Sequence, residues 1–503
     1  MKVTGVLLET TAIQSYVFGS KKLKENLAAS YLISNVYDGL LTDIADEMFG
    51  ANKELCLWRE APEEINITRE DIYMEVGYIG GGNALLLVKD PEKAIPFVQQ
   101  WTKKLLLEAP GLSTAVAVGE VDTEDSQTDI SDLFEQINEN KFTYHPQAYL
   151  LRHGITTECP RTGLSAECLA LDGKYISCVA ASKLKHEEDA HNMFSQIFET
   201  VLNGHSFPKV LDSLGQSTGE SHIAIVHIDG NGMGQRFIAC EDIPSLRKLS
   251  DTVHDATETA MKELVEEIVR DHKYYREVMG LELKNRELPI RPIILGGDDV
   301  TFVCDARLGI YFAEIFMKAF SNKHVNDRKQ LSSCAGVAIT KTKYPFYRGY
   351  ELAEQLCKSA KGKAKDDQSW LDYHIAYSGF SGNPSVIRQR HFTVREGALC
   401  LRPYCVTPEL KGPRNFHQFK VGAKCLSDRW PRNKQMELRN TLTLGKNATK
   451  EFIIEQKYRG YELPEIQEHP AFRDEGWENG ETPYFDMLEL AEFYPMDKIG
   501  VGL

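Results

Sequence analysis

Two adjacent carboxylates stand in the sequence GGDD, which occupies residues 296–299 and is flanked on both sides by apolar β-forming residues. Gly296 and Gly297 predict a tight β-hairpin with its turn at the glycines. Asp298 and Asp299 would then lie at the rim of a sheet, where carboxylates can hold a hard divalent cation. Glycine and aspartate are also common in ordinary turns, so the motif alone leaves a purely structural turn open.

A third carboxylate, Asp229, ends a short apolar run and is followed by a glycine-rich bend at 230–234. This pattern predicts a buried strand with Asp229 at its edge. A helix is expected over 245–269, because apolar residues recur there at helical spacing. Strand, helix and hairpin in this order can bring Asp229 beside the GGDD acids, and three carboxylates repel one another unless a cation neutralises them. The sequence therefore predicts a metal site, with an ordinary strand-end turn residue as the alternative for Asp229.

The chain contains the same order of predicted elements twice. Each copy has a strand, a helix, a hairpin with glycines at its tip, a second helix and a last strand. This β-α-β-β-α-β order is ferredoxin-like and predicts an α+β fold. The first copy is expected at 3–9, 21–45, 72–88, 91–108 and 113–118, and the second at 223–229, 245–269, 293–304, 307–320 and 332–339.

The two copies differ at the tip of the hairpin. Gly81, Gly82, Asn83 and Ala84 stand where the second copy has GGDD. The neutral side chains of Asn83 and Ala84 cannot replace two carboxylates at a metal. The first copy is therefore predicted to keep a glycine-lined binding surface without a catalytic centre of its own.

Length and composition limit the possible classes of protein. The 503 residues predict several domains, and 42% hydrophobic with 26% charged residues is typical of a globular protein. No apolar run is long enough to span a bilayer, and the start does not read as a signal peptide. The 11 cysteines are scattered, which favours a reducing, cytoplasmic location without a membrane partner. The formal net charge of −15 argues against a wholly basic nucleic-acid surface.

The second copy resembles the catalytic Palm domain of the large, polymerase-like subunit of type III CRISPR complexes, whose relatives include the GGDEF nucleotide cyclases. The resemblance rests on the strand and bend at Asp229, the GGDD hairpin, the segments 335–339 and 344–346, and the helix 352–361. The first copy resembles that family's degenerate first Palm domain at 13–18 and 28–33, and the C-terminal part resembles its helical cap at 430–434 and 438–442.

This resemblance implies four parts of the chain. They are a degenerate first Palm domain at 1–145, a small linker module at 146–218, a catalytic second Palm domain at 219–380 and a mainly helical C-terminal cap at 381–503. Large members of the family often begin with an HD nuclease domain, whereas here the first Palm pattern starts at once. The pairs His254-Asp255 and Asp271-His272 are interpreted as chance surface pairs.

The linker departs from the zinc module that often lies between the two Palm domains. Cys159, Cys168 and Cys178 are eight and nine residues apart, counted between cysteines, and lack paired CxxC spacing. His153 is the available fourth ligand. We expect unbridged cysteines here, and bound zinc is the less favoured interpretation.

The family makes cyclic oligoadenylates or related cyclic nucleotides from ATP, so the resemblance implies a pyrophosphate-releasing nucleotidyltransferase. Such chemistry uses two divalent cations, Mg²⁺ or Mn²⁺. The implied metal ligands are Asp229 and Asp298, with Asp299 as a third ligand or hydrogen-bond partner and the Ile228 carbonyl as a further oxygen. The nucleotide would contact the bend at Gly230, Asn231 and Gly232, the glycines Gly296 and Gly297, and Lys361; an acceptor would lie near Gly81 and Gly82.

Two other functions remain open from the sequence. One is a non-catalytic RNA-binding or scaffold subunit of a CRISPR-like effector complex, which would keep the Palm fold for its shape. The other is a diguanylate cyclase using GTP. The resemblance further implies RNA-guided partner subunits or a homo-oligomer, a downstream effector that senses the cyclic product, and a role in antiviral defence.

Overall fold

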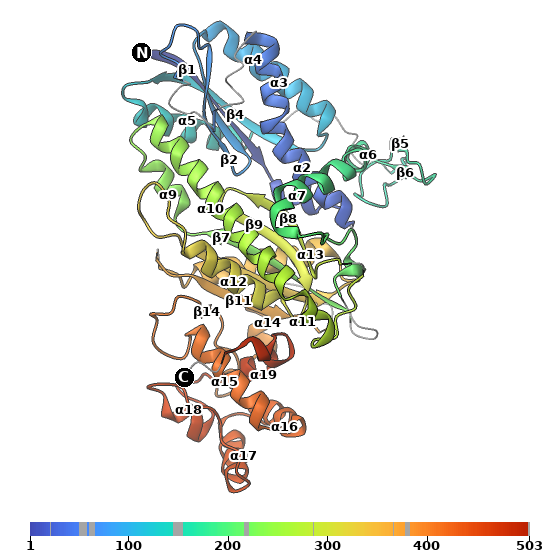
Figure 1. The fold of residues 1–503 in the computed structure, drawn as a ribbon, viewed down its shortest axis with the longest axis vertical. Helices are drawn as coiled ribbons and strands as arrows, with labels where there is room; N and C mark the ends of the chain where they lie inside the picture. The colour runs from blue at the N-terminus through green and yellow to red at the C-terminus, as the bar shows by residue number, and fades with distance from the viewer. Residues whose placement is uncertain are drawn as a thin grey trace.

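The computed structural model describes residues 1–20, 22–49, 58–59, 66–143, 154–215, 221–284, 286–365, 367–377 and 383–500. The chain runs along the long axis of the molecule in Figure 1, from a first α/β layer at the N-terminal end, through a second and larger sheet, to a helical region at the other end. A small hairpin made of β5 (Cys168–Leu169) and β6 (Tyr175–Ile176) projects sideways between the two sheets.

The first sheet is four-stranded and antiparallel, with strand order β2-β3-β1-β4. Its elements are β1 (Lys2–Thr11), α1 (Ile13–Phe18), α2 (Leu23–Asp38), α3 (Leu40–Phe49), β2 (Met74–Gly80), β3 (Asn83–Val88), α4 (Pro91–Glu108), β4 (Ser113–Asp122) and α5 (Ser126–Asn140). Alternate residues of β1 enter different cores: Val6 and Leu8 join the main hydrophobic core, whereas Val3 and Leu7 join a smaller one. Both faces of this sheet are therefore covered, as the alternation of side chains along a strand requires.

The second sheet has six strands in the order β14-β11-β10-β7-β9-β8. Its elements are β7 (His222–Gly230), α9 (Met233–Ile238), α10 (Ile243–Arg270), α11 (His272–Glu277), β8 (Ile290–Gly296), β9 (Asp299–Asp305), α12 (Gly309–Ser321), β10 (Ser333–Lys341), α13 (Phe346–Lys361), β11 (Trp370–Ile375) and β14 (Tyr404–Cys405). Four of these strands repeat the first sheet's order, with β8, β9, β7 and β10 in place of β2, β3, β1 and β4. β11 extends this ferredoxin-like core by pairing parallel to β10.

The two Palm-like units pack reciprocally. Helix α2 of the first contacts β8 of the second, and α10 of the second contacts β2 of the first. Arg247 of α10 anchors this junction, because its buried guanidinium donates to a Glu75 carboxylate oxygen at 2.5 Å and to the Gly77 carbonyl at 3.3 Å. The two units are thus related by an approximate two-fold axis, and their glycine hairpins face each other.

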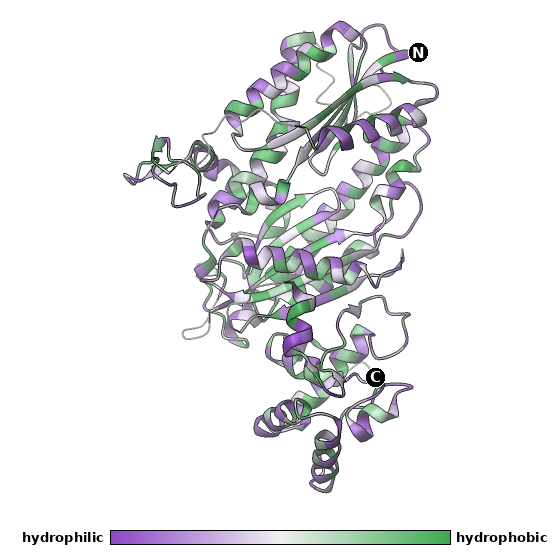
Figure 2. Cartoon of the chain, turned by 180° about the vertical axis from the view of Figure 1, so that it is seen from behind, coloured by the Kyte–Doolittle hydropathy of each residue, from purple (hydrophilic) through white to green (hydrophobic). Residues whose placement is uncertain are grey.

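The remaining parts are mainly helical. The linker contains α6 (Cys178–Lys185), α7 (Glu187–Ile197), α8 (Glu199–Leu202) and η2 (Leu211–Ser213), and the C-terminal part contains α14 (Pro384–His391), β12 (Thr393–Val394), β13 (Gly397–Ala398), α15 (Phe416–Arg429), α16 (Arg432–Leu442), α17 (Lys446–Tyr458), α18 (Pro470–Glu475), α19 (Tyr484–Glu492) and η3 (Met496–Lys498). Figure 2 shows hydrophobic colour along the strands of the central sheet and mixed colour on the outer helices. In the C-terminal part, buried Arg402 pairs with buried Asp486 and Glu489.

The predicted fold class is confirmed: two ferredoxin-like βαββαβ units are followed by a mainly helical region. The single helix predicted over 21–45 is wrong in detail, because α2 stops at Asp38 and α3 starts at Leu40. Gly39 lies between them, and its N–H bonds back to the Asn35 carbonyl. Within the described part of the chain, no helix is both long and apolar enough to cross a bilayer.

Glycines let two helices pack closely on neighbouring strands of the second sheet, α13 on β10 and α12 on β7. A β-carbon on Gly336 of β10 would overlap the Ala353 carbonyl oxygen and would lie 2.5 Å from the Cys357 amide nitrogen, both in α13. A β-carbon on Gly309 of α12 would overlap the side chain of Ala224 in β7. The absence of side chains at these points lets α13 lie directly on the sheet, close to the end of β7.

We predict that Gly336→Ala destabilises the protein by about 1–3 kcal/mol, because the added methyl group must push α13 away from β10. Urea unfolding followed by circular dichroism measures this change. Gly234→Ala is the matched control, because nothing lies within 4 Å of a β-carbon on this helical glycine and alanine favours helices. Equal stability of the two variants would contradict the proposed contact.

Candidate active site

The three predicted carboxylates meet at the end of β7. Asp229 lies directly opposite Asp299 of β9 in the antiparallel ladder, so their side chains are on the same face of the sheet. Asp298 belongs to the two-residue turn between β8 and β9, which is closed by pairing of Gly296 with Asp299. Gly297 begins this turn with a φ of 59°, a conformation that glycine adopts without strain.

Gly230 allows Asp298 to approach β7. A β-carbon on Gly230 would lie 2.7 Å from Asp298 Oδ2 and 2.8 Å from Asp298 Cβ. Any larger residue at 230 would therefore push the hairpin carboxylate away from Asp229. The predicted strand-end glycine has a packing role that brings the acids together.

Lys361 reaches the same point from the last residue of α13. Its Nζ donates to Asp229 Oδ2 at 2.6 Å and to the Gly230 carbonyl at 3.0 Å. Burial disfavours the charged form of Lys361, but the nearby Asp229 carboxylate outweighs it, and the pKa of Lys361 is raised. The ammonium is thus a fixed positive charge beside the strand end.

The charges at this site are unevenly compensated. Burial, followed by the negative charges of Asp229 and Asp299, raises the pKa of Asp298 from its usual 3.8 to about 7. Asp299 Oδ1 lies 3.2 Å from His227 Nδ1. Burial opposes protonation of His227, yet the adjacent Asp299 carboxylate raises its pKa overall. Burial, together with the neighbouring negative charges, therefore holds the Asp298 carboxyl partly protonated near neutral pH.

The donor set suits a hard divalent cation. Mg²⁺ and Mn²⁺ prefer oxygen ligands. The site offers carboxylate oxygens of Asp229, Asp298 and Asp299 and the carbonyl oxygen of Gly230. A bound cation would also offset the burial and negative charge that raise the pKa of Asp298. In the described residues no three His, Cys, Asp or Glu side chains form a ready-made metal group. The reason is visible in the contacts: Asp229 turns to Lys361 and Asp299 to His227.

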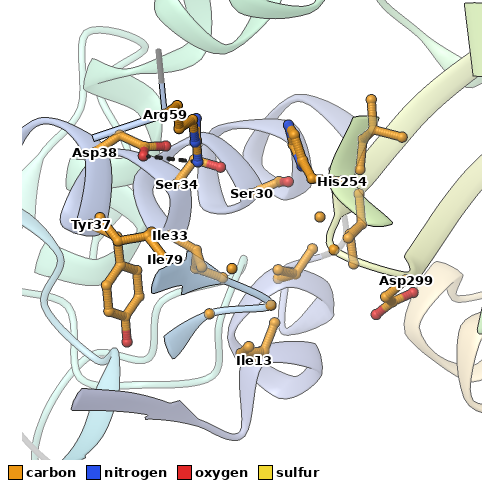
Figure 3. Close-up of a pocket in the computed structure, with 18 residues that line it drawn as sticks. Ile13, Ser30, Ile33, Ser34, Tyr37, Asp38, Arg59, Ile79, His254 and Asp299 are labelled. Carbon is orange, nitrogen blue, oxygen red and sulfur yellow. Dashed lines mark ion pairs between the residues drawn. The ribbon is translucent and has the colours of Figure 1, made fainter. Parts of the chain in front are cut away.

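The two glycine hairpins face each other across a pocket. A β-carbon on Gly297 would lie 3.5 Å from the Gly81 amide nitrogen, so the two hairpin tips are in contact range. Figure 3 shows the pocket beside them, with Asp299 at one edge and Ile13 of α1 below. Its volume of about 130 Å³ is below the roughly 300–1,000 Å³ of sites that enclose a drug-sized ligand. It can therefore enclose only part of a nucleotide.

The far end of this pocket is polar. Ser30, Ser34 and Asp38 of α2 line it together with Arg59 and His254 (Figure 3). An Arg59 guanidinium nitrogen lies 3.6 Å from Asp38 Oδ1. Burial and the nearby Arg59 charge lower the pKa of His254, so its imidazole is mainly neutral and can accept as well as donate.

Sequence reasoning missed this polar end. His254 was interpreted as part of a chance surface pair, yet it lines the pocket. Its spacing on α10 does not reveal this, because the opposing wall comes from α2 of the other unit. Ser30 and Ser34 are four residues apart on α2, and this helical spacing is the one sequence signal that could have indicated a polar face there.

The glycine hairpins align differently from the prediction. Gly80 pairs with Asn83 as Gly296 pairs with Asp299. Asp298 therefore corresponds to Gly82, and Asp299 corresponds to Asn83; the predicted alignment was wrong by one residue. Gly81 and Gly82 both have positive φ, 59° and 78°, so the degenerate tip is a turn of two glycines.

The first unit keeps a trace of the same arrangement. Glu9 pairs with Asn83 as Asp229 pairs with Asp299. Lys141, directly after α5, lies 2.7 Å from Glu9, as Lys361 at the end of α13 lies beside Asp229. The acid and the lysine are both present in the first unit, but the hairpin carboxylates are not.

The other predicted site residues lie either at the pocket or within the packed sheet beside it. Gly296, Gly297, Gly81 and Gly82 all line the pocket, and Gly232, the residue before α9, has nothing within 4 Å of a β-carbon. Asn231 is engaged internally, because its side-chain amide donates to Ser332 Oγ and to the Gln368 carbonyl, both at 3.0 Å. Its backbone N–H donates to the Ser332 carbonyl. Ile228 is buried in the ladder between Val300 and Ala335, and its role as a metal ligand stays a prediction.

The linker cysteines lie outside this site. Cys159, Cys168 and Cys178 are free thiols, and Cys159 and Cys168 pack with apolar residues such as Ile176 and Ala180. His153, the proposed fourth zinc ligand, lies outside the described residues. The prediction about zinc therefore stays a prediction.

Comparison with known proteins supports the Palm assignment. Residues 222–369 match the family described as Cas10/Cmr2, second palm domain. No curated protein sequence matches the chain. The fold resembles crystal structures of the Csm1–Csm4 cassette: one in complex with pppApApA has a TM-score of 0.56 at 13% identity, covering 97% of this chain and 69% of that one.

Two further Csm1–Csm4 structures give similar values. The cassette in complex with cA4 and the apo cassette each have a TM-score of 0.53 at 12% identity, covering 97% of this chain and 70% of that one. The predicted resemblance to the Palm-domain large subunit of type III CRISPR systems is confirmed by the match of residues 222–369 to the Cas10/Cmr2 second palm domain and by the likeness of the fold to Csm1.

We predict that Mn²⁺ binding depends on pH through Asp298. The folded protein holds a proton on Asp298 below about pH 7, and a cation must displace it, so affinity should fall about tenfold for each pH unit below 7 and level off above 8. The folded protein without a cation binds the Asp298 proton more tightly than the unfolded chain does. Its free energy of unfolding should therefore fall as pH rises from 3.8, the usual pKa, to about 7.

Electron paramagnetic resonance of free Mn²⁺, titrated with protein between pH 6 and 8.5, measures this dependence. Asp298→Asn should bind Mn²⁺ more weakly and lose the tenfold slope. A wild-type affinity that stays constant across this range would contradict the assignment of Asp298.

Proposed function

We propose that this protein is a nucleotidyltransferase that joins ATP or other nucleoside triphosphates into cyclic oligonucleotides or cyclic nucleotides, with release of pyrophosphate. The observation that carries the proposal is the grouping of Asp229, Asp298, Asp299 and Lys361 at one strand end, where Asp299 also lines the pocket shared with the glycine hairpin of the first unit. The similar structures are complexes of the Csm1–Csm4 cassette with pppApApA, with one ATP and with cA4. In the proposed reaction, ATP would be a reactant, a linear molecule such as pppApApA an intermediate, and a cyclic molecule such as cA4 a product.

In this proposal each part of the site has a physical task. Asp229 and Asp298, with Asp299 beside them, would hold the divalent cations, which activate the attacking 3′-hydroxyl and neutralise the leaving pyrophosphate when bound. Lys361 would exchange its contact with Asp229 for a phosphate oxygen of the triphosphate. Glycines at 296 and 297 leave the hairpin backbone open to close approach by the nucleotide. The catalytic contribution would be mainly positioning and electrostatics.

The first unit would present the acceptor. Gly81 and Gly82 form the opposite rim of the pocket, and no carboxylate at this hairpin tip competes with the phosphates of a second nucleotide. The polar residues Asp38, Arg59 and His254 lie where a base or ribose of the acceptor would enter. One reactive centre would thus work against one binding platform.

The scaffold alternative explains the charges less well. Burial and the neighbouring carboxylates raise the pKa of Asp298, so keeping the three acids together costs free energy in a fold that has no use for them. A diguanylate cyclase of the symmetric kind would need two active hairpins that face each other, whereas here the facing tip is a turn of Gly81 and Gly82. A Csm4-like partner, other RNA-guided subunits and a downstream effector of the cyclic product belong to the proposal, as does a role in antiviral defence.

The proposed reaction predicts pyrophosphate release and a cyclic product from at least one nucleoside triphosphate with Mg²⁺ or Mn²⁺. Incubation with ATP, GTP, CTP or UTP, each alone, followed by a pyrophosphate assay and mass spectrometry of the products, tests this. Asp298→Asn should reduce the rate roughly a hundredfold or more, because it removes charge from the reacting centre. Asp132→Asn, on the exposed face of α5, is the matched control and should leave the rate unchanged.

A cyclic diguanylate product from GTP alone would favour the diguanylate cyclase instead. No product from any nucleotide, with or without the target RNA and partner subunits of a CRISPR-like complex, would favour the scaffold.

The acceptor platform makes a separate prediction about Gly81. Gly81→Asn should place a side chain in the pocket with little backbone strain, since asparagine tolerates positive φ. We expect joining of two nucleotides to slow by about tenfold to a hundredfold through misplacement of the acceptor. Gly173→Asn is the control, because Gly173 also has positive φ and nothing lies within 4 Å of its β-carbon. Joining rates come from quenched time courses with radiolabelled nucleotide.

Binding of a single non-hydrolysable triphosphate to Gly81→Asn should stay within about threefold of wild type, which is less than 1 kcal/mol. Loss of that binding together with the joining rate would place the donor, rather than the acceptor, at the first hairpin.

A further inference from the structure

His227 is a buried polar side chain in an otherwise apolar strand. It lies two residues before Asp229 in β7, and only 4% of it is exposed. The neighbouring residues Val226 and Ile228 are fully buried in the hydrophobic core. A buried imidazole costs free energy unless its nitrogens are satisfied, so its partners indicate what it does.

The partners of His227 lie on the hairpin that carries the acids. His227 is directly opposite Thr301 in the β7–β9 ladder and diagonal to Asp299, on the same face of the sheet. Its Nδ1 lies 3.2 Å from Thr301 Oγ1 and 3.2 Å from Asp299 Oδ1. One ring nitrogen therefore touches both the strand beneath the site and one of its carboxylates.

Aromatic packing fixes the orientation of the imidazole. Tyr350 of α13 meets the His227 ring edge-on, at 5.5 Å between centroids and 72° between planes. Tyr350 is itself stacked on Phe18 of α1, at 3.8 Å. The ring of His227 therefore packs against Tyr350 of the second unit, which is itself stacked on Phe18 of the first unit.

The first unit supplies an internal comparison. Its register pairs Leu7 with Leu85 at the positions where the second unit pairs His227 with Thr301. The same sheet is therefore built with two leucines where the neighbouring hairpin has no carboxylate. The polar pair accompanies Asp299, and the fold does not need it.

We infer that His227 is a positioning residue that fixes Asp299, so that the carboxylate keeps one orientation toward Asp229 and Asp298. This inference rests on the proposed function for its consequence in catalysis. The groups that face His227 are Asp299 and Thr301 from β9 and Tyr350 from α13, with Asp229 and Glu354 as the more distant charges. A partner that orients a metal-binding carboxylate typically changes metal affinity or activity by about 10- to 100-fold when it is lost.

The test uses variants of the full-length chain. His227→Leu installs the residue that the first unit has and removes the imidazole that contacts Asp299. His227→Asn keeps a side-chain nitrogen on the γ-carbon, where Nδ1 is in histidine. Each change is made alone and together with Asp299→Asn, and Asp299→Asn is also made alone, so that three single and two double variants complete two double-mutant cycles.

Mn²⁺ affinity without nucleotide, followed by electron paramagnetic resonance at pH 8, is the first readout. His227→Leu should weaken Mn²⁺ binding at least about tenfold, and His227→Asn should stay within about threefold of wild type. With Asp299→Asn in place, His227→Leu should cause no further loss, because its effect passes through that carboxylate. In pyrophosphate release, His227→Leu should lower kcat about tenfold with little change in KM.

Thermal unfolding separates folding from positioning. If His227→Leu weakens Mn²⁺ binding as much in the Asp299→Asn background as in wild type, its effect does not pass through Asp299, and the inference is overturned. Equal losses for His227→Asn and His227→Leu would overturn it too. Absence of pyrophosphate release by wild type, with the coupling in Mn²⁺ binding intact, would overturn the proposed reaction and leave the role of His227 standing.

Discussion

Crowding of like charges at the end of β7 is the constraint on which the rest of this structure depends. Asp229 and Asp299 are direct neighbours across the ladder, and Asp298 is packed against Gly230 beside them. Each acid is balanced in a different way. Asp229 has the Lys361 ammonium, Asp299 has His227, and Asp298 has a raised pKa instead of a cationic partner. Helix α13 supplies Lys361 and the ring that packs on His227, which explains why its close seat on Gly336 matters.

The two Palm units show what the sheet looks like with and without that constraint. The first unit keeps the strand order, the bulge before the hairpin and an acid–lysine pair, Glu9 with Lys141. Where the hairpin acids disappear, the polar residues beneath them disappear as well, and leucines fill the space. The two hairpins have the same ladder register, so they differ in their side chains. The loss of the hairpin acids and the loss of the polar residues beneath them therefore go together.

Much of this could be read from the sequence, and the failures have physical causes. Hydrophobic periodicity and glycine-rich turns located the strands and helices of the two βαββαβ repeats, because each has one clear buried face, whereas α5, α9, α11 and β11 were not predicted. The grouping of Asp229 with the GGDD acids followed from chain order, and Lys361 followed from the family resemblance. The alignment of the hairpins was wrong by one residue, because a glycine at position 80 extends the run in the first unit and only the ladder pairing shows where the turn begins.

His227 and the polar end of the pocket escaped prediction for a different reason. A histidine within an apolar strand carries no periodic signal, and its meaning depends on the residue opposite it, Thr301, which register alone reveals. The pocket wall combines α2 of one unit with His254 of α10 from the other, and no spacing within either helix predicts that meeting.

The reciprocal packing of the units links these observations. α10 packs on β2 and α2 packs on β8, so each hairpin strand is held by a helix of the other unit, and Arg247 joins α10 to β2 through a buried ion pair with Glu75. A small pocket between two hairpins that are held this way can accept part of one nucleotide from each side. The loss of carboxylates from one tip is then an advantage for joining nucleotides, because two acidic tips in contact would repel each other and the phosphates of the second substrate.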